Sequence, residues 1–139
     1  FYGAIGRDTG FMMKKEWFFW PMGILMRKLG GIPVYRSKQM RSTDIIAERA
    51  KNSSTFRLCI TPEGTRKAQA DWKKGFYYIA KGAGIPILLA GIDYSTKTIT
   101  IGKEIRPTGD IDKDMREIKL YFKDFKGKHP EYFSIGDIE

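Results

Sequence analysis

Apolar side chains recur at helical spacing in two segments of the second half of the chain. The positions are Phe76, Ile79, Ala80 and Ala83 in one segment and Ile111, Met115, Ile118, Phe122 and Phe125 in the other. Steps of three and four residues place such side chains on one face of a helix. Gly82 and Gly84 are typical of a helix end. The pattern therefore predicts one amphipathic helix that these glycines close and a second over residues 111–125.

Start and stop signals predict two more helices nearer the N-terminus. Pro21 suits the first turn of a helix, and Gly30 and Gly31 end that helix after about residue 29. The Ser-Thr-Asp run at residues 42–44 suits the start of the next helix. The Asn-Ser-Ser run at residues 52–54 then breaks it. Its apolar side is formed by Ile45, Ile46, Ala47 and Ala50.

Short apolar runs between these helices predict β-strands. Residues 56–60 predict a buried strand with Cys59 as a small buried side chain, and Pro62 ends it because proline cannot donate to a strand ladder. Residues 85–92 predict a central strand. Residues 97–101 alternate as a half-buried strand does, so the two strands should form a hairpin around residues 93–96. Residues 11–13 and the run that begins at Gly31 predict two further strands.

Strands that alternate with helices predict an α/β fold. We expect one domain over residues 1–139, with a partly parallel, mixed sheet flanked by helices; 42% hydrophobic residues suffice for a core. Ligands of such sheets bind beyond the carboxyl ends of the strands. Arg36 and Arg66 both follow strand ends, so we expect them to converge on one crevice.

The chemistry of this crevice depends on the turn Pro62-Glu63-Gly64-Thr65-Arg66. With Gly64 between Glu63 and Arg66, a tight turn would aim a carboxylate, a backbone N–H and a guanidinium into one small volume. Such a set suits a phosphate or a polyol. The alternative is a surface turn in which Glu63 and Arg66 pair with each other.

Three sequence blocks resemble those of the glycerolipid acyltransferases, the family that includes the 1-acylglycerol-3-phosphate acyltransferases. In family order they are Gly30-Gly31-Ile32-Pro33-Val34-Tyr35-Arg36-Ser37, Pro62-Glu63-Gly64-Thr65-Arg66 and Gly84-Ile85-Pro86-Ile87-Leu88. Two positions depart from the family pattern, since Tyr35 stands where Asp is usual and Leu89 where a second proline is common. The resemblance implies a glycerol-3-phosphate acyltransferase-like α/β fold.

The resemblance also implies a reaction in phospholipid synthesis. In the family, an acyl group passes from a thioester of coenzyme A or acyl carrier protein to a hydroxyl of a lysophosphatidate-like glycerol-phosphate lipid, with no metal and no bound cofactor. Carried over to this chain, Arg36 and Arg66 bind the acceptor phosphate, and Glu63 accepts from the glycerol hydroxyl or holds Arg66. Gly64 and Thr65 let the backbone approach the ligand. The supporting strand positions are Gly31, Ile32, Pro33, Ile85 and Pro86.

The catalytic block of the family is a histidine, four residues and an aspartate. The only histidine here, His129, is followed five residues later by Ser134, and we expect it in a surface loop. We therefore expect no catalytic residue in this chain, a His-x4-Asp block upstream of Phe1, and no acyl transfer at an enzymatic rate by these 139 residues alone. A non-catalytic, lipid-phosphate-binding relative would share every residue and stays open as an alternative.

A net charge of +9 favours anionic partners. The run Trp17-Phe18-Phe19-Trp20 has basic neighbours, as at a bilayer interface; the alternative is that half of these rings lie in the core. Those neighbours are Lys14, Lys15, Arg27 and Lys28. No run of about 18 apolar residues predicts a transmembrane helix. We expect a cytoplasmic protein, peripheral to the inner face of the membrane, with anionic lipid as a partner.

Three further expectations concern partners and acidic residues. Loss of an upstream segment would expose apolar surface, so we expect self-association through the N-terminal third. Its centre would lie near Phe1, Phe11, Trp17 or Trp20. A basic nucleic-acid-binding module is the other alternative, although no helix-turn-helix, zinc-ligand or RNA-recognition pattern occurs and we expect no nucleic-acid partner. Acidic residues at 110, 112 and 114 stand at a helix start, where they suit the helix dipole rather than calcium.

Overall fold

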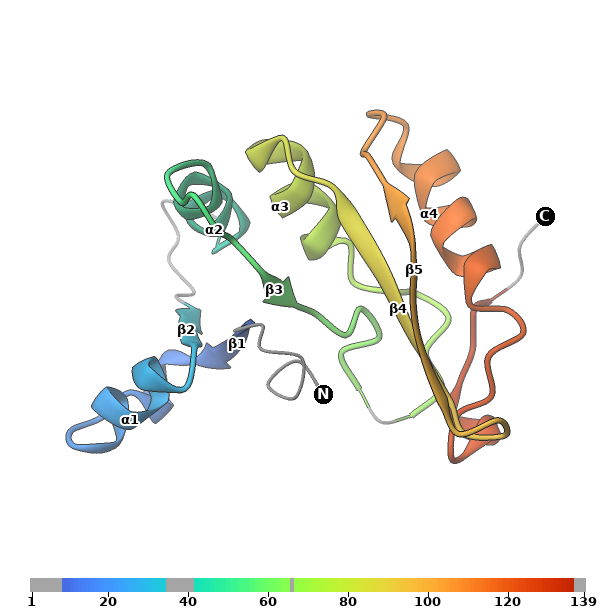
Figure 1. Ribbon diagram of the computed structural model, residues 1–139, viewed down its shortest axis with the longest axis horizontal. Coiled ribbons are helices and arrows are strands. Elements are labelled where there is room, and N and C mark those ends of the chain that lie inside the picture. Colours follow the sequence, from blue (N-terminus) through green and yellow to red (C-terminus); the bar gives the residue numbers. More distant parts are fainter. Residues whose placement is uncertain (1–8, 35–41, 66, 137–139) are drawn as a thin grey trace. The chain divides into compact units, whose positions relative to one another are not determined.

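The computed structural model describes residues 9–34, 42–65 and 67–136 (Figure 1). Its contacts divide the chain into two compact units, Phe1–Thr61 and Pro62–Glu139. Helices and strands are interleaved along the described chain, and the first unit contains parallel strands. These features confirm the predicted α/β fold.

The first unit is built on a parallel sheet of three strands in the order β2-β1-β3. The strands are β1 (Gly10–Lys14), β2 (Gly31–Val34) and β3 (Leu58–Cys59). Phe11 of β1 lies opposite Gly31 on one side and Cys59 on the other. A short 3-10 helix, η2 (Lys15–Trp17), and helix α1 (Met22–Lys28) connect β1 to β2. Pro21 is the N-cap residue of α1, so the helix begins one residue after the predicted position.

Helix α2 (Ser42–Lys51) begins and ends close to its predicted bounds. It buries Ile46, Ala47 and Ala50, whereas Ile45 is exposed. Ile46 and Ile45 line a small cavity with Ile32 and Pro33 of β2, so the N-terminal half of the helix lies next to that strand. The predicted apolar side of this helix is confirmed at three of its four positions.

The prediction of a buried strand over residues 56–60 is wrong in two respects. Only Leu58 and Cys59 pair with a neighbouring strand, and the thiol-bearing Cys59 is exposed. Side chains along residues 56–60 alternate between half-buried and exposed. The reason is that successive side chains of a strand point to opposite faces, and here one face is partly covered while the other, with Cys59, is in solvent.

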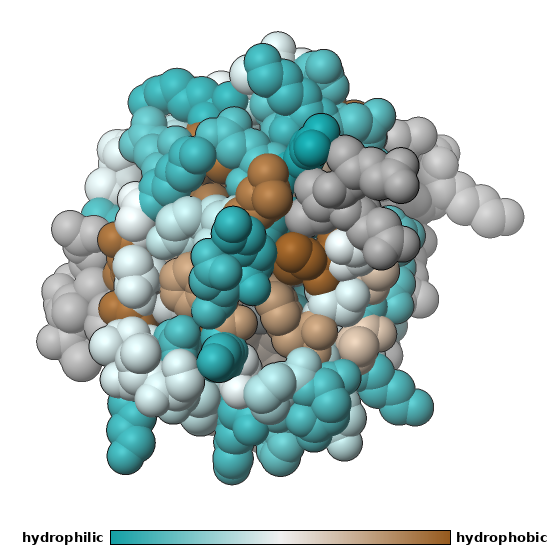
Figure 2. Space-filling view, turned by 90° about the vertical axis from the view of Figure 1, so that its right-hand side faces the viewer, coloured by the Kyte–Doolittle hydropathy of each residue, from teal (hydrophilic) through white to brown (hydrophobic). Residues whose placement is uncertain are grey.

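The second unit contains an antiparallel hairpin and two α-helices. Strands β4 (Ile87–Asp93) and β5 (Thr98–Ile105) form the predicted hairpin, with a bulge between Leu88 and Ala90. Helix α3 (Gly75–Ala83) precedes it, and α4 (Ile111–Tyr121) and the short η3 (Pro130–Tyr132) follow. Their core consists of Trp72, Leu89, Ile105, Met115 and Ile118. Figure 2 shows that hydrophilic residues dominate the side of the molecule that lies at the right of Figure 1, around a small group of apolar residues.

Residues 85–92 do not form a central strand. Within the described residues, β4 pairs with β5 alone, and its alternate side chains Leu88 and Ile92 are exposed, Ile92 at 58%. Every second residue of a strand faces the same side, so Ile87, Leu89 and Gly91 turn to the core. Ile85 and Pro86 precede the strand, and the backbone N–H of Ile85 donates to Ala80 O at 3.1 Å, at the end of α3.

A buried polar cluster joins α3 to the start of α4. The Tyr77 hydroxyl donates to Asp114 Oδ2 at 2.8 Å, and Thr108 donates to the same carboxylate from its backbone N–H at 2.7 Å and its hydroxyl at 2.9 Å. Burial alone would raise the pKa of Asp114, but these hydrogen bonds lower it. Asp110 instead caps the helix by accepting from the backbone N–H of Lys113 at 3.1 Å. Two of the acidic residues predicted at this helix start thus have different roles, since Asp114 accepts buried hydrogen bonds and Asp110 caps the helix.

Candidate functional site

The turn at residues 62–65 has the tight geometry that its sequence predicts. Pro62 and Glu63 form the turn, and Gly64 has a φ angle of +66°. This left-handed backbone favours glycine because a Cβ atom strains it. Gly64 is also exposed, so its backbone is accessible to a ligand.

Two hydrogen bonds hold the turn and leave one donor free. The backbone N–H of Lys73 donates to Pro62 O at 2.7 Å, which brings the chain back to the turn before α3 begins. Thr65 Oγ1 accepts from the backbone N–H of Lys67 at 3.2 Å. A hydroxyl that accepts in this way keeps its own O–H as a donor. Thr65 can thus donate to an anion in front of the turn.

The carboxylate of Glu63 is half-buried and forms no hydrogen bond or ion pair with another described residue. Burial raises the pKa of Glu63 because it disfavours the charged form. A partly desolvated carboxylate without a partner is a typical feature of a ligand site. Glu63 is therefore available to accept from a ligand hydroxyl.

Arg36 and Arg66 lie outside the described residues. Their convergence on one crevice, and the alternative pairing of Glu63 with Arg66, stay predictions. The supporting positions Gly31, Ile32 and Pro33 lie in β2, as expected, with Gly31 and Ile32 buried.

Sequence reasoning missed Lys73. The Cγ and Cε atoms of its side chain lie 3.4 Å and 4.0 Å from the position that a Cβ atom of Gly64 would occupy. The aliphatic part of Lys73 therefore runs along the open side of Gly64. The available sequence signal was the pair Lys73-Lys74 directly before the predicted helix, seven residues after Arg66.

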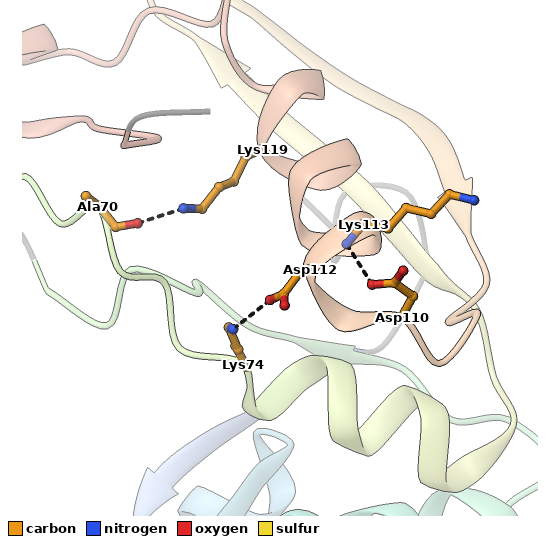
Figure 3. A network of polar contacts seen from close by, with 6 residues as sticks. All are labelled: Ala70, Lys74, Asp110, Asp112, Lys113 and Lys119. Atoms are coloured by element: carbon orange, nitrogen blue, oxygen red, sulfur yellow. Dashed lines mark hydrogen bonds and ion pairs between the residues drawn. The ribbon is translucent and has the colours of Figure 1, made fainter. Parts of the chain in front are cut away.

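The second unit also carries a groove of about 720 Å³ beside the start of α4 (Figure 3). Lys119 Nζ donates to Ala70 O at 2.8 Å, and Lys74 Nζ lies 3.4 Å from Asp112 Oδ1. The side chain of Lys113 extends away from both contacts (Figure 3). Lys74 and Lys119 thus already contact protein oxygens. Arg116 also lines the groove, and residues 62–65 do not.

The aromatic run before α1 is largely exposed. Trp17 and Phe19 are more than half exposed and Trp20 is 83% exposed, whereas Phe18 is half-buried. On α1 itself Ile24 is also exposed, as are Leu25 and Leu29. The alternative that half of the four rings lie in the core is therefore wrong for the described structure. Within the described ranges, every helix is too short or too polar to cross a bilayer.

His129 lies in an exposed loop, as predicted, with Nδ1 3.4 Å from Glu131 Oε1. Among the described residues, no three His, Cys, Asp or Glu side chains are grouped as ligands for a metal ion.

A comparison with protein-family models identifies the chain. The model described as Acyltransferase matches residues 1–92, which include β1 to β3, the turn at residues 62–65 and most of β4. The chain belongs to the acyltransferase family. No curated protein and no solved structure matches it significantly. In this acyltransferase, the matched region contains the turn with Gly64 and the nearby Lys73. Helix α4 lies beyond that region, as do most of the residues that line the groove beside it.

Proposed function

We propose that this acyltransferase acts on a lysophosphatidate-like glycerol-phosphate lipid in phospholipid synthesis, and that residues 62–66 hold the phosphate of that acceptor. The acyl group would come from a thioester of coenzyme A or acyl carrier protein. The observation that carries the proposal is the left-handed Gly64, flanked by a carboxylate and a hydroxyl donor that have no partner among the described residues.

Each side chain of the turn has a role that its geometry supports. The open backbone at Gly64 admits a phosphate oxygen, and the Thr65 hydroxyl donates to it. The guanidinium of Arg66, with that of Arg36, would bind the phosphate through paired, charge-assisted hydrogen bonds. Glu63, whose pKa is raised by burial, would accept from the glycerol hydroxyl or hold Arg66. The proposal gives His129 no part in the reaction.

Phosphate affinity tests this proposal directly. Arg66→Gln should weaken binding of sn-glycerol 3-phosphate by about 10-fold or more, since a hydrogen bond to a charged group contributes about 1.5–3 kcal/mol. Arg106→Gln is the matched control, because Arg106 Nη2 lies 3.0 Å from Glu104 Oε1 in the same unit, outside the proposed site. Isothermal titration of the 139-residue chain measures both. Equal affinities for the two variants would refute the proposed site.

We also propose that the exposed aromatic run contacts the anionic inner face of the cytoplasmic membrane. Trp17 and Trp20 are exposed, and so are the basic residues Lys15, Arg27 and Lys28, which lie within eleven positions of them in the sequence. Tryptophan rings favour the bilayer interface, and each nearby cation attracts anionic lipid by about 1 kcal/mol. The combination favours a charged lipid surface over an uncharged apolar partner.

Vesicle flotation tests the membrane contact. The chain should float with phosphatidylcholine vesicles that contain phosphatidylglycerol, and Trp17→Ser with Trp20→Ser should abolish this. Tyr132→Ser, at an exposed aromatic of the second unit, is the control. If the chain does not bind the vesicles but forms dimers that the double variant dissociates, the surface serves self-association instead.

A further inference from the structure

Lys73 returns to the turn that the proposed function assigns to phosphate. Its backbone N–H donates to Pro62 O at 2.7 Å, so residue 73 is fixed beside residue 62 although eleven positions separate them. This bond belongs to the backbone and does not depend on the side chain. The side chain of Lys73 is thus held next to the turn without being needed to hold it.

The direction of the side chain follows from its contact with Gly64. Cγ and Cε lie 3.4 Å and 4.0 Å from the position that a Cβ atom of Gly64 would occupy. Nζ is one C–N bond of about 1.5 Å beyond Cε, so it lies within about 5.5 Å of that position. The ammonium group is therefore close to the open backbone of Gly64.

The charge of Lys73 is also available. Among the described residues, Lys73 Nζ makes no ion pair or hydrogen bond, although Glu63 belongs to the same turn. The next residue differs in this respect, since Lys74 Nζ lies 3.4 Å from Asp112 Oδ1 and points toward α4 (Figure 3). Two adjacent lysines thus have different surroundings, one at the turn with Gly64 and one in the groove.

We propose that Lys73 is a further phosphate-binding residue of the acceptor site. This inference rests on the proposed function of residues 62–66. Lysine binds phosphate as a compact charge with rotatable donors, which complements the planar fork of an arginine. The missing side chain of Gly64 makes room for the stem of Lys73, and the backbone of Gly64 is exposed and so accessible to the phosphate.

The test compares Lys73→Gln with Lys74→Gln, two variants that remove the same charge from adjacent positions. The probes are inorganic phosphate and sn-glycerol 3-phosphate, titrated at low ionic strength. Lys73→Gln should weaken binding of both probes by about fivefold, the effect of one charge at about 4 Å in water, and Lys74→Gln by less than about twofold. If Lys73→Gln weakens the binding of both probes by the same factor, Lys73 contacts the phosphate group. A loss of affinity for sn-glycerol 3-phosphate alone would contradict this role.

Three further measurements separate the possible outcomes. Lys73→Arg should retain most of the affinity, and the free energy of unfolding of Lys73→Gln should equal that of the wild type, because the bond to Pro62 is made by the backbone.

If Arg66→Gln weakens binding and Lys73→Gln does not, the inference fails and the proposed function stands. Equal losses for Lys73→Gln and Lys74→Gln would also overturn it. If the wild type binds neither probe, or Arg66→Gln has no effect, the proposed function itself fails.

Discussion

The substitution Tyr77→Phe removes one oxygen atom from the centre of the second unit. Tyr77 and Asp114 are each 1% exposed, and the Tyr77 hydroxyl donates to Asp114 Oδ2 at 2.8 Å. The hydroxyl oxygen of Tyr77 also accepts from the backbone N–H of Gly109 at 3.1 Å. Phenylalanine keeps the ring and its packing, so the variant isolates these two hydrogen bonds between α3 and the start of α4.

The expected loss follows from what remains after the substitution. A hydrogen bond to a charged group contributes about 1.5–3 kcal/mol, and an unpaired buried donor costs about 1–3 kcal/mol. Asp114 keeps both bonds from Thr108, and the N–H of Gly109 is only partly buried, so neither penalty reaches its upper limit. We therefore expect Tyr77→Phe to lower the free energy of unfolding by about 2 kcal/mol at pH 7.

Urea denaturation measures this loss, with Tyr78→Phe as the matched control. Tyr78 is the neighbouring residue, 49% exposed, and its hydroxyl has no hydrogen bond with another described residue. The control should stay within about 0.5 kcal/mol of the wild type. If the two variants have the same free energy of unfolding, the buried cluster does not stabilise the second unit.

Acid titration adds a second test of the same cluster. The folded pKa of Asp114 is lowered overall, so its carboxylate stabilises the fold above the unfolded pKa of about 3.9 and loses this effect as the pH falls through the folded pKa. The bond from Tyr77 contributes to that lowering. The difference between Tyr77→Phe and the wild type should therefore be largest at neutral pH and shrink in acid.

Two further predictions concern the hairpin. A Cβ atom on Gly91 would overlap the ring of Phe125, so Gly91→Ala should destabilise the chain by about 1–3 kcal/mol in urea denaturation, and Phe125→Leu should relieve part of this loss. Hydrogen bonds from Ser95 and Thr96 lower the pKa of Asp93 to about 2. The ionised carboxylate of Asp93 thus stabilises the fold at neutral pH, and this stabilisation is lost as the pH falls from about 4 to 2. Thermal unfolding should therefore show that Asp93→Asn destabilises the chain at pH 7 but not at pH 2.

Much of the secondary structure was predictable because local patterns decide it. Met115 and Ile118 repeat at helical spacing and lie in the core of the second unit, and Gly84 ends α3 in the left-handed conformation. The number of neighbours of a strand is not a local property. An apolar run such as β4 is compatible with a central strand and with a hairpin strand that has one exposed face. The same limit explains the exposed Cys59.

The site was predictable only as far as the turn itself. Gly64 beside Pro62 and Glu63 indicates a tight turn, and the structure has one. Lys73 reaches this turn through a backbone bond to Pro62, and no local pattern specifies a contact over that separation. Asp114 is a similar case. Its place at the start of α4 suggests only a helix-dipole role, whereas its buried carboxylate accepts hydrogen bonds from Tyr77 and Thr108.

The most direct test of the proposed acceptor site is a nuclear magnetic resonance titration of the 139-residue chain with sn-glycerol 3-phosphate. We expect saturable shifts of the backbone amides of Gly64, Thr65 and Lys73, and the loss of these shifts in Arg66→Gln. The amides of the groove beside α4, such as that of Lys119, should not move. Saturable shifts in that groove with none at residues 62–73 would show that the acceptor phosphate binds there and not at the turn.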